Sequence, residues 1–75
     1  MTPDHLRRIG ESLYGERWIA PLARDLRVAR KTTQRWLSGY SEIPPGLSRK
    51  LHRLLTYRIA TLQVLAADLR KRRAA

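Results

Sequence analysis

Apolar residues recur at helical spacing in four stretches of the chain, and each stretch predicts one helix. In the first stretch, Leu6, Ile9 and Leu13 are three or four residues apart and would share one face of a helix over residues 3–14. Gly10 interrupts this helix and costs it about 1 kcal/mol relative to alanine. The pattern still favours a helix here because its apolar face is continuous.

Two short helices are predicted next, over residues 18–26 and 30–38. The apolar face of the first is formed by Leu22, Ala23 and Leu26. The apolar face of the second is formed by Thr33, Trp36 and Leu37. Its opposite face carries three cations and an amide, namely Arg30, Lys31, Gln34 and Arg35. A helix that is apolar on one side and basic on the other can pack on its own domain while facing a polyanion.

The last stretch, from about residue 45 to residue 72, predicts one long helix, or two helices broken near residues 56–57. A stripe along it steps by four, three, four and three residues, through Leu55, Ile59, Leu62, Ala66 and Leu69. Such spacing is typical of a seam between helices. One interpretation is that the stripe folds back on the first helix. The other, which we favour, is that residues 55–69 form the interface of a homodimer.

Composition narrows the class of protein. The chain has 75 residues, of which 43% are hydrophobic, which suits one small all-α domain. It has no cysteine, so helix packing must stabilise it without disulfides. The net charge of +10 favours polyanionic partners. Without an apolar run of about 20 residues, a membrane partner is not expected, and we predict a soluble, cytoplasmic, nucleoid-associated protein.

Residues that carry enzyme chemistry do not form a recognisable constellation. His5 and His52 have no metal-ligand spacing to each other, and the six acidic residues form no acid–base pair. A glycine-rich phosphate loop and a nucleophile elbow are both absent from the sequence. We therefore expect no catalytic residue, no metal, no cofactor and no small-molecule ligand.

The segment over residues 22–39 resembles the helix-turn-helix of the phage-repressor type, represented by lambda repressor and Cro. The matching positions are Ala23, Leu26, Val28, Trp36 and Gly39. Three positions depart from the family pattern. Arg27 replaces the turn glycine, Ala29 replaces a capping Ser or Thr, and Thr33 replaces Val or Ile. A non-glycine residue in a left-handed turn costs about 1–2 kcal/mol, and a missing cap costs about 1 kcal/mol.

This resemblance implies a compact lambda-repressor-like bundle of four or five helices that forms a single domain, with its helix-turn-helix over about residues 18–39. It further implies a transcriptional regulator from a phage or mobile element that binds double-stranded DNA. Such a regulator would be a repressor on a palindromic operator, with base contacts from Arg30, Lys31, Gln34 and Arg35. The phosphate contacts expected from this arrangement are Trp18, Arg24, Thr32, Ser38 and Tyr40. For Trp18, a place in the core is an equally good interpretation.

Two other functions remain open from the sequence. The same charge suits a protein that coats or shapes DNA without regard to sequence. The second alternative is an antitoxin-like module, in which the stripe over residues 55–69 binds another protein. RNA binding is less favoured because the chain has no Phe and its two Trp occupy core-type positions.

Overall fold

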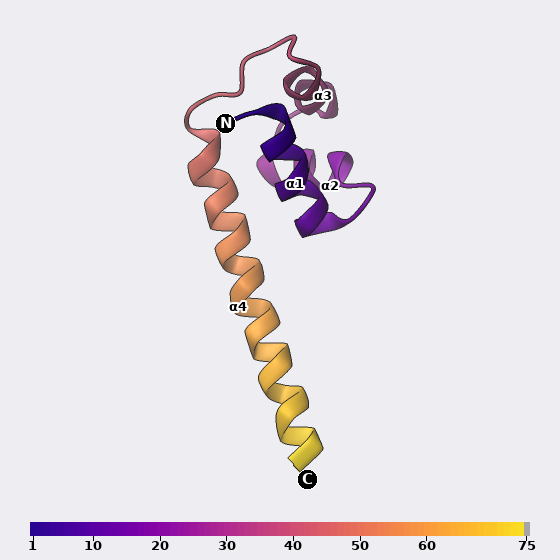
Figure 1. Ribbon diagram of the computed structural model, residues 1–75, viewed down its shortest axis with the longest axis vertical. Helices are drawn as coiled ribbons and strands as arrows, with labels where there is room; N and C mark the ends of the chain where they lie inside the picture. Colours follow the sequence, from indigo (N-terminus) through magenta and orange to yellow (C-terminus); the bar gives the residue numbers. More distant parts are fainter. Residues whose placement is uncertain (75) are drawn as a thin grey trace.

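The computed structural model describes residues 1–74, and all regular elements in that range are helices. They are α1 (Pro3–Tyr14), α2 (Ile19–Leu26), α3 (Arg30–Ser38) and α4 (Leu47–Ala74). The first three helices and the start of α4 form the body of the molecule, and the rest of α4 projects from it (Figure 1). The molecule is therefore elongated, with extents of 54 × 22 × 20 Å.

Most of the predicted helix bounds are confirmed. The first helix and α3 have the predicted limits, and α2 begins one residue later than Trp18, which precedes its first turn. The long helix runs from Leu47 to Ala74 without interruption, so it begins and ends two residues later than predicted. The alternative of a break near residues 56–57 is therefore wrong. The physical reason is that no glycine or proline follows Gly46, so nothing in the backbone stops the helix.

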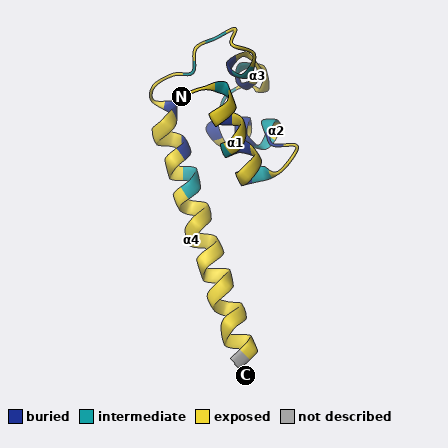
Figure 2. Ribbon diagram, viewed as in Figure 1, coloured by how far each residue is buried: buried dark blue, intermediate teal, exposed yellow. Residues whose placement is uncertain are grey.

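The core lies between the three short helices and the first turns of α4. Its buried side chains form one cluster, composed of Leu6, Trp18, Leu22, Leu26, Trp36, Leu47 and Leu51. Figure 2 shows that burial in α4 is confined to the part beside the body. Ile43, in the loop before α4, packs against the cluster. The body is therefore a small helical unit that α4 closes with about two turns.

A close approach between α1 and the residue preceding α2 explains the glycine inside α1. Gly10 is buried, and a Cβ added to it would overlap the indole ring of Trp18. Trp18 itself is only 4% exposed. The glycine that weakens α1 as an isolated helix thus makes room for one of the two tryptophan side chains in the core.

The turn between α2 and α3 has the left-handed backbone conformation that the resemblance to the phage-repressor type implied. Arg27 has φ 59° and ψ 41°, in the left-handed region that favours glycine. The N–H of Val28 donates to the carbonyl of Ala23 at 3.0 Å, which closes the turn. Ala29 then precedes α3 with an extended backbone and no side-chain cap. The turn is formed, and its strain is concentrated at Arg27.

Replacing Arg27 with glycine is expected to raise the free energy of unfolding by about 0.5–1 kcal/mol, because the relief of left-handed strain exceeds the entropy that glycine adds to the unfolded chain. Urea denaturation followed by circular dichroism measures the change. Arg24→Gly is the matched control, since a helix-interior glycine should lower stability by about 1 kcal/mol. A loss of stability in Arg27→Gly would contradict the assignment of strain to this turn.

Tyr14 joins three helices at the lower side of the body. Its hydroxyl donates a 2.6 Å hydrogen bond to Oδ2 of Asp25 on α2, and the guanidinium of Arg58 on α4 lies 6.0 Å from its ring centre. Burial of the phenol, together with the hydrogen bond to the Asp25 carboxylate, raises the pKa of Tyr14 to about 12. The phenol therefore remains a hydrogen-bond donor at any physiological pH.

Candidate nucleic-acid interface

Helix α3 separates its apolar and basic residues onto opposite faces, as the sequence predicted. Thr33 and Trp36 are buried, at 0% and 5% exposure, and hold the helix on the body. The four residues predicted to contact bases are all exposed, namely Arg30, Lys31, Gln34 and Arg35. With nine residues, α3 is about 13 Å long. A short basic helix is thus held on the body by its inner face and open to solvent on its outer face.

Residues 38–41 contact both the side chain and the backbone carbonyl of Arg35. The guanidinium of Arg35 lies over the ring of Tyr40, 5.6 Å from the ring centre. The carbonyl of Arg35 accepts hydrogen bonds from the Ser38 hydroxyl and from the Ser41 N–H, each at 3.2 Å. Gly39, with φ 82°, allows the chain to reverse there. These contacts limit the conformations of Arg35 before any ligand binds.

An open hollow of about 430 Å³ lies along this part of α3. Its lining contains two cations, an amide and two hydroxyl groups, contributed by Lys31, Gln34, Arg35, Ser38 and Tyr40. A carboxylate is absent from this lining, so the local charge is positive. The hollow therefore suits an anionic partner with hydrogen-bonding edges.

The predicted phosphate-contacting residues are not equivalent in the structure. Ser38 and Tyr40 are exposed beside the residues predicted to contact bases, and Tyr40 is 80% exposed. Thr32 is half-buried on α3. Arg24 is exposed on α2, where its Nε lies 3.5 Å from Oδ1 of Asp25. Three of the four thus lie on α3 or the loop after it, and Arg24 lies on the neighbouring helix with a carboxylate partner.

The prediction that Trp18 contacts phosphate is corrected by its burial. Its side chain belongs to the core cluster and packs against Gly10, so the indole ring is buried in the body and does not face solvent. The sequence could not decide between the two roles, because both place a tryptophan at the start of a helix. The core interpretation is the one that the packing supports.

Arg17 is a residue that the sequence analysis missed. Together with Glu16, Ile19, Ala20 and Arg30, it lines a hollow of about 430 Å³ between the start of α2 and the start of α3. The Glu16 carboxylate offsets one of the two arginines, and the N–H groups at the start of α2 add partial positive charge. Arg17 is 13 residues from Arg30 in the sequence, so only the folding of α2 against α3 brings them to one hollow.

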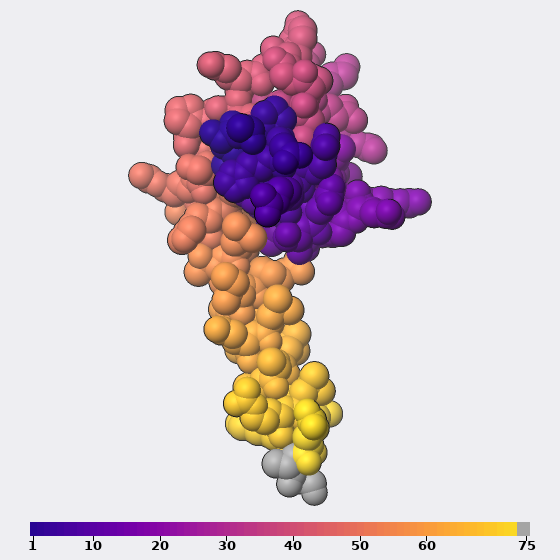
Figure 3. Space-filling model, viewed as in Figure 1, coloured from indigo at the N-terminus to yellow at the C-terminus, as the bar shows by residue number. Residues whose placement is uncertain are grey.

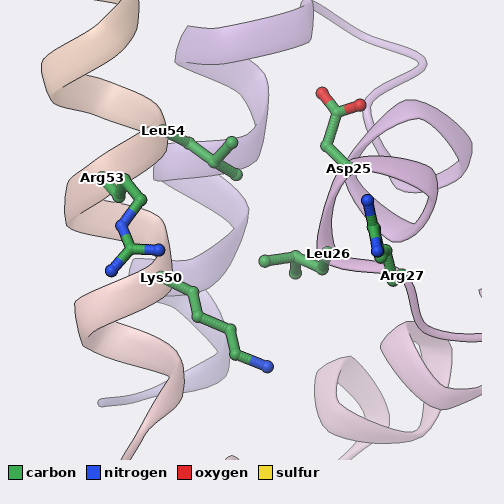
Figure 4. Close-up of a pocket in the computed structure, with 6 residues that line it drawn as sticks. All are labelled: Asp25, Leu26, Arg27, Lys50, Arg53 and Leu54. Carbon is green, nitrogen blue, oxygen red and sulfur yellow. The ribbon is translucent and has the colours of Figure 1, made fainter.

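A third hollow, of about 230 Å³, lies between the end of α2 and α4 (Figure 4). Arg27, Lys50 and Arg53 line it, but so does Asp25, whose carboxylate already accepts from Tyr14. The close-up shows Arg27 at the carboxyl end of α2, and Lys50 and Arg53 on α4 at the other side of the hollow.

No protein family, curated protein or solved structure matches this chain. The interface must therefore be interpreted from its own geometry. Among residues 1–74, no group of three or more His, Cys, Asp or Glu side chains is placed to hold a metal ion. Within the same range, every helix is too short or too polar to cross a bilayer.

Proposed function

We propose that this protein is a sequence-specific regulator of transcription that binds double-stranded DNA with α3 in the major groove. The observation that carries this proposal is the division of α3 into a buried face with Thr33 and Trp36 and an exposed basic face. The major groove is about 12 Å wide and accepts one helix. The net charge of +10 supplies the long-range attraction to the duplex.

The exposed side chains suit two kinds of contact. Arg30 and Arg35 each have a fork of donors that matches O6 and N7 of guanine, and the amide of Gln34 matches N6 and N7 of adenine. The hydroxyl groups of Ser38 and Tyr40 lie beside them and suit phosphate oxygens. Arg17 and the start of α2 form a further phosphate-binding surface. Base contacts would determine the sequence preference, and phosphate contacts would determine how the protein is oriented on the duplex.

The proposed fold is that of the lambda-repressor type. The left-handed Arg27 occupies the position where that family has its turn glycine, and Gly39, also left-handed, occupies the position that ends the second helix. Thr33 and Trp36 are buried at the positions where the family has apolar residues. These four positions support the likeness, and with it a small repressor that acts on a palindromic operator as a dimer.

The test is a comparison of two duplexes, one selected by the protein from a random pool and one of random sequence. Arg35→Ala should weaken binding to the selected duplex by about 5- to 150-fold, which corresponds to about 1–3 kcal/mol. Binding to the random duplex should change far less, since it depends on the net charge of +10, to which Arg35 contributes one unit. Fluorescence anisotropy at fixed salt measures both affinities.

Arg49→Ala is the matched control, because Arg49 is an exposed arginine in the first turn of α4 and outside the α3 surface. It removes the same charge without removing a predicted base contact. Equal losses on both duplexes in Arg35→Ala would show that Arg35 does not read bases. That result would refute sequence-specific recognition by α3.

Sequence-independent DNA binding is a second candidate, favoured by cations at both ends of the molecule. Arg70, Lys71, Arg72 and Arg73 lie at the end of α4, far along the long axis from α3. A protein that coats DNA needs such distributed charge and no fixed readout. Affinities within about threefold for the selected and random duplexes would favour this function, since specific binders discriminate by about 10³ or more.

A further inference from the structure

Beyond the body, α4 is a helix without a partner in the monomer. All residues from 56 to 73 are exposed, including Ile59 and Leu62 at 55% each and Leu69 at 61%. Fold-back of this stripe onto α1, one of the two interpretations of the sequence, does not occur. An unsupported helix with β-branched residues is marginal in water, so this segment needs packing from another molecule.

The pattern of the exposed stripe identifies the kind of partner. In heptad terms, Leu55, Leu62 and Leu69 take position d, while Ile59 and Ala66 take position a. Leu55 is half-buried where the stripe meets the body, and the other four residues are exposed. In coiled coils, leucine at d with a β-branched residue such as Ile59 at a favours an assembly of two strands. Leu65, also 55% exposed, lies at the flanking position g and widens the apolar surface. The stripe is thus suited to a second copy of the same helix.

The position of α3 along the molecule gives the orientation of the pair. Helix α3 lies at the end of the long axis opposite to the carboxyl end of α4 (Figures 1 and 3). A parallel α4 pair puts both α3 helices at one end, where a single duplex can meet them. An antiparallel pair puts them at opposite ends. The orientation therefore rests on the proposed DNA-binding function, whereas pairing itself rests on the stripe.

We propose that α4 forms a parallel, two-fold-symmetric coiled coil with α4 of a second copy. Its contacts are made by Leu55, Ile59, Leu62, Ala66 and Leu69. Such a pair brings together the basic segment 70–73 of each chain, four cations from each copy. These charges repel each other in the dimer, and added salt screens them. Self-association should therefore strengthen with salt, while DNA binding weakens with it.

Cysteine cross-linking tests the register, because the chain contains no cysteine of its own. In the parallel dimer, position 69 faces its own copy, so Leu69→Cys should form a disulfide-linked dimer at least tenfold faster than Val64→Cys. Val64 is 68% exposed on the opposite face of α4 and serves as the control. Equal rates for the two variants would overturn the parallel pair, as would a wild-type chain that stays monomeric at all concentrations.

Sedimentation equilibrium without DNA measures self-association directly. Leu62→Lys should weaken the wild-type dimer at least tenfold, and Val64→Lys should leave it nearly unchanged. Both substitutions lie outside the body, so α-helical content and thermal unfolding of the body should be retained. Equal weakening by both variants would contradict the proposed coiled-coil interface. Self-association that weakens with salt would contradict the proposed repulsion between the two 70–73 segments.

The two proposals fail separately. Suppose that Leu69→Cys cross-links faster than Val64→Cys, but Arg35→Ala loses equal affinity for the selected and random duplexes. The proposed dimer is then supported and sequence-specific recognition is contradicted. If binding to the selected duplex is specific but the wild-type chain remains a monomer, sequence-specific recognition is supported and the α4 coiled coil is contradicted. An α4 stripe that pairs only with a different protein belongs to this second outcome, and it would favour an antitoxin-like module.

Discussion

Replacing Gly10 with alanine is expected to lower the free energy of unfolding by about 1–3 kcal/mol, although alanine is the better helix former. The added methyl group would overlap the Trp18 ring, which is held in the core and cannot move aside without disturbing its neighbours. In a domain of this size, such a loss lowers the melting temperature by roughly 4–8 °C per kcal/mol. Thermal and urea unfolding followed by circular dichroism measure the change.

Two companion variants separate packing from helix propensity. Ser12→Ala changes an exposed position on the same helix and should be neutral or slightly stabilising. Trp18→Leu destabilises by itself, but Gly10→Ala should cost much less in that background because the overlapping ring is gone. A Gly10→Ala protein that is more stable than wild type would show that α1 and Trp18 are not in close contact.

Local features of this fold could be predicted from the sequence because each depends on residues close together in the chain. The two faces of α3 follow from offsets of three and four residues, and its carboxyl end follows from Gly39, whereas Ala29 carries no capping signal for its start. The left-handed turn at Arg27 followed from its place in a recognisable pattern. The continuity of α4 was only one of two alternatives, since propensity at Thr56 and Tyr57 is too weak a signal to decide it.

Features that depend on packing between distant segments could not be predicted. Gly10 looked like a weak point in a helix until Trp18 was placed against it. The sequence also gave no sign that Arg17 lines one hollow with Arg30, because that depends on the angle between α2 and α3. The exposure of the α4 stripe was likewise undecided, since the same heptad spacing suits an intramolecular or an intermolecular partner.

Replacing Thr33 with valine is expected to raise the free energy of unfolding by about 1–3 kcal/mol, because it removes a buried hydroxyl without changing the shape of the side chain. Thr33 is 0% exposed, and its Oγ1 has no hydrogen-bond partner within the described structure. Both residues are β-branched, so their helix propensities are similar. Urea unfolding measures the gain, and anisotropy with the selected duplex should show unchanged DNA affinity because Thr33 faces the body.

Thr32→Val is the matched control for this gain. Thr32 is the adjacent residue on α3 and is only half-buried, so water can satisfy its hydroxyl in the folded state. The same substitution there should leave stability nearly unchanged. If Thr33→Val were no more stable than wild type, the Thr33 hydroxyl must have a hydrogen-bonding partner in solution. The inner face of α3 would then be held partly by polar contacts, and its orientation would depend on more than apolar packing.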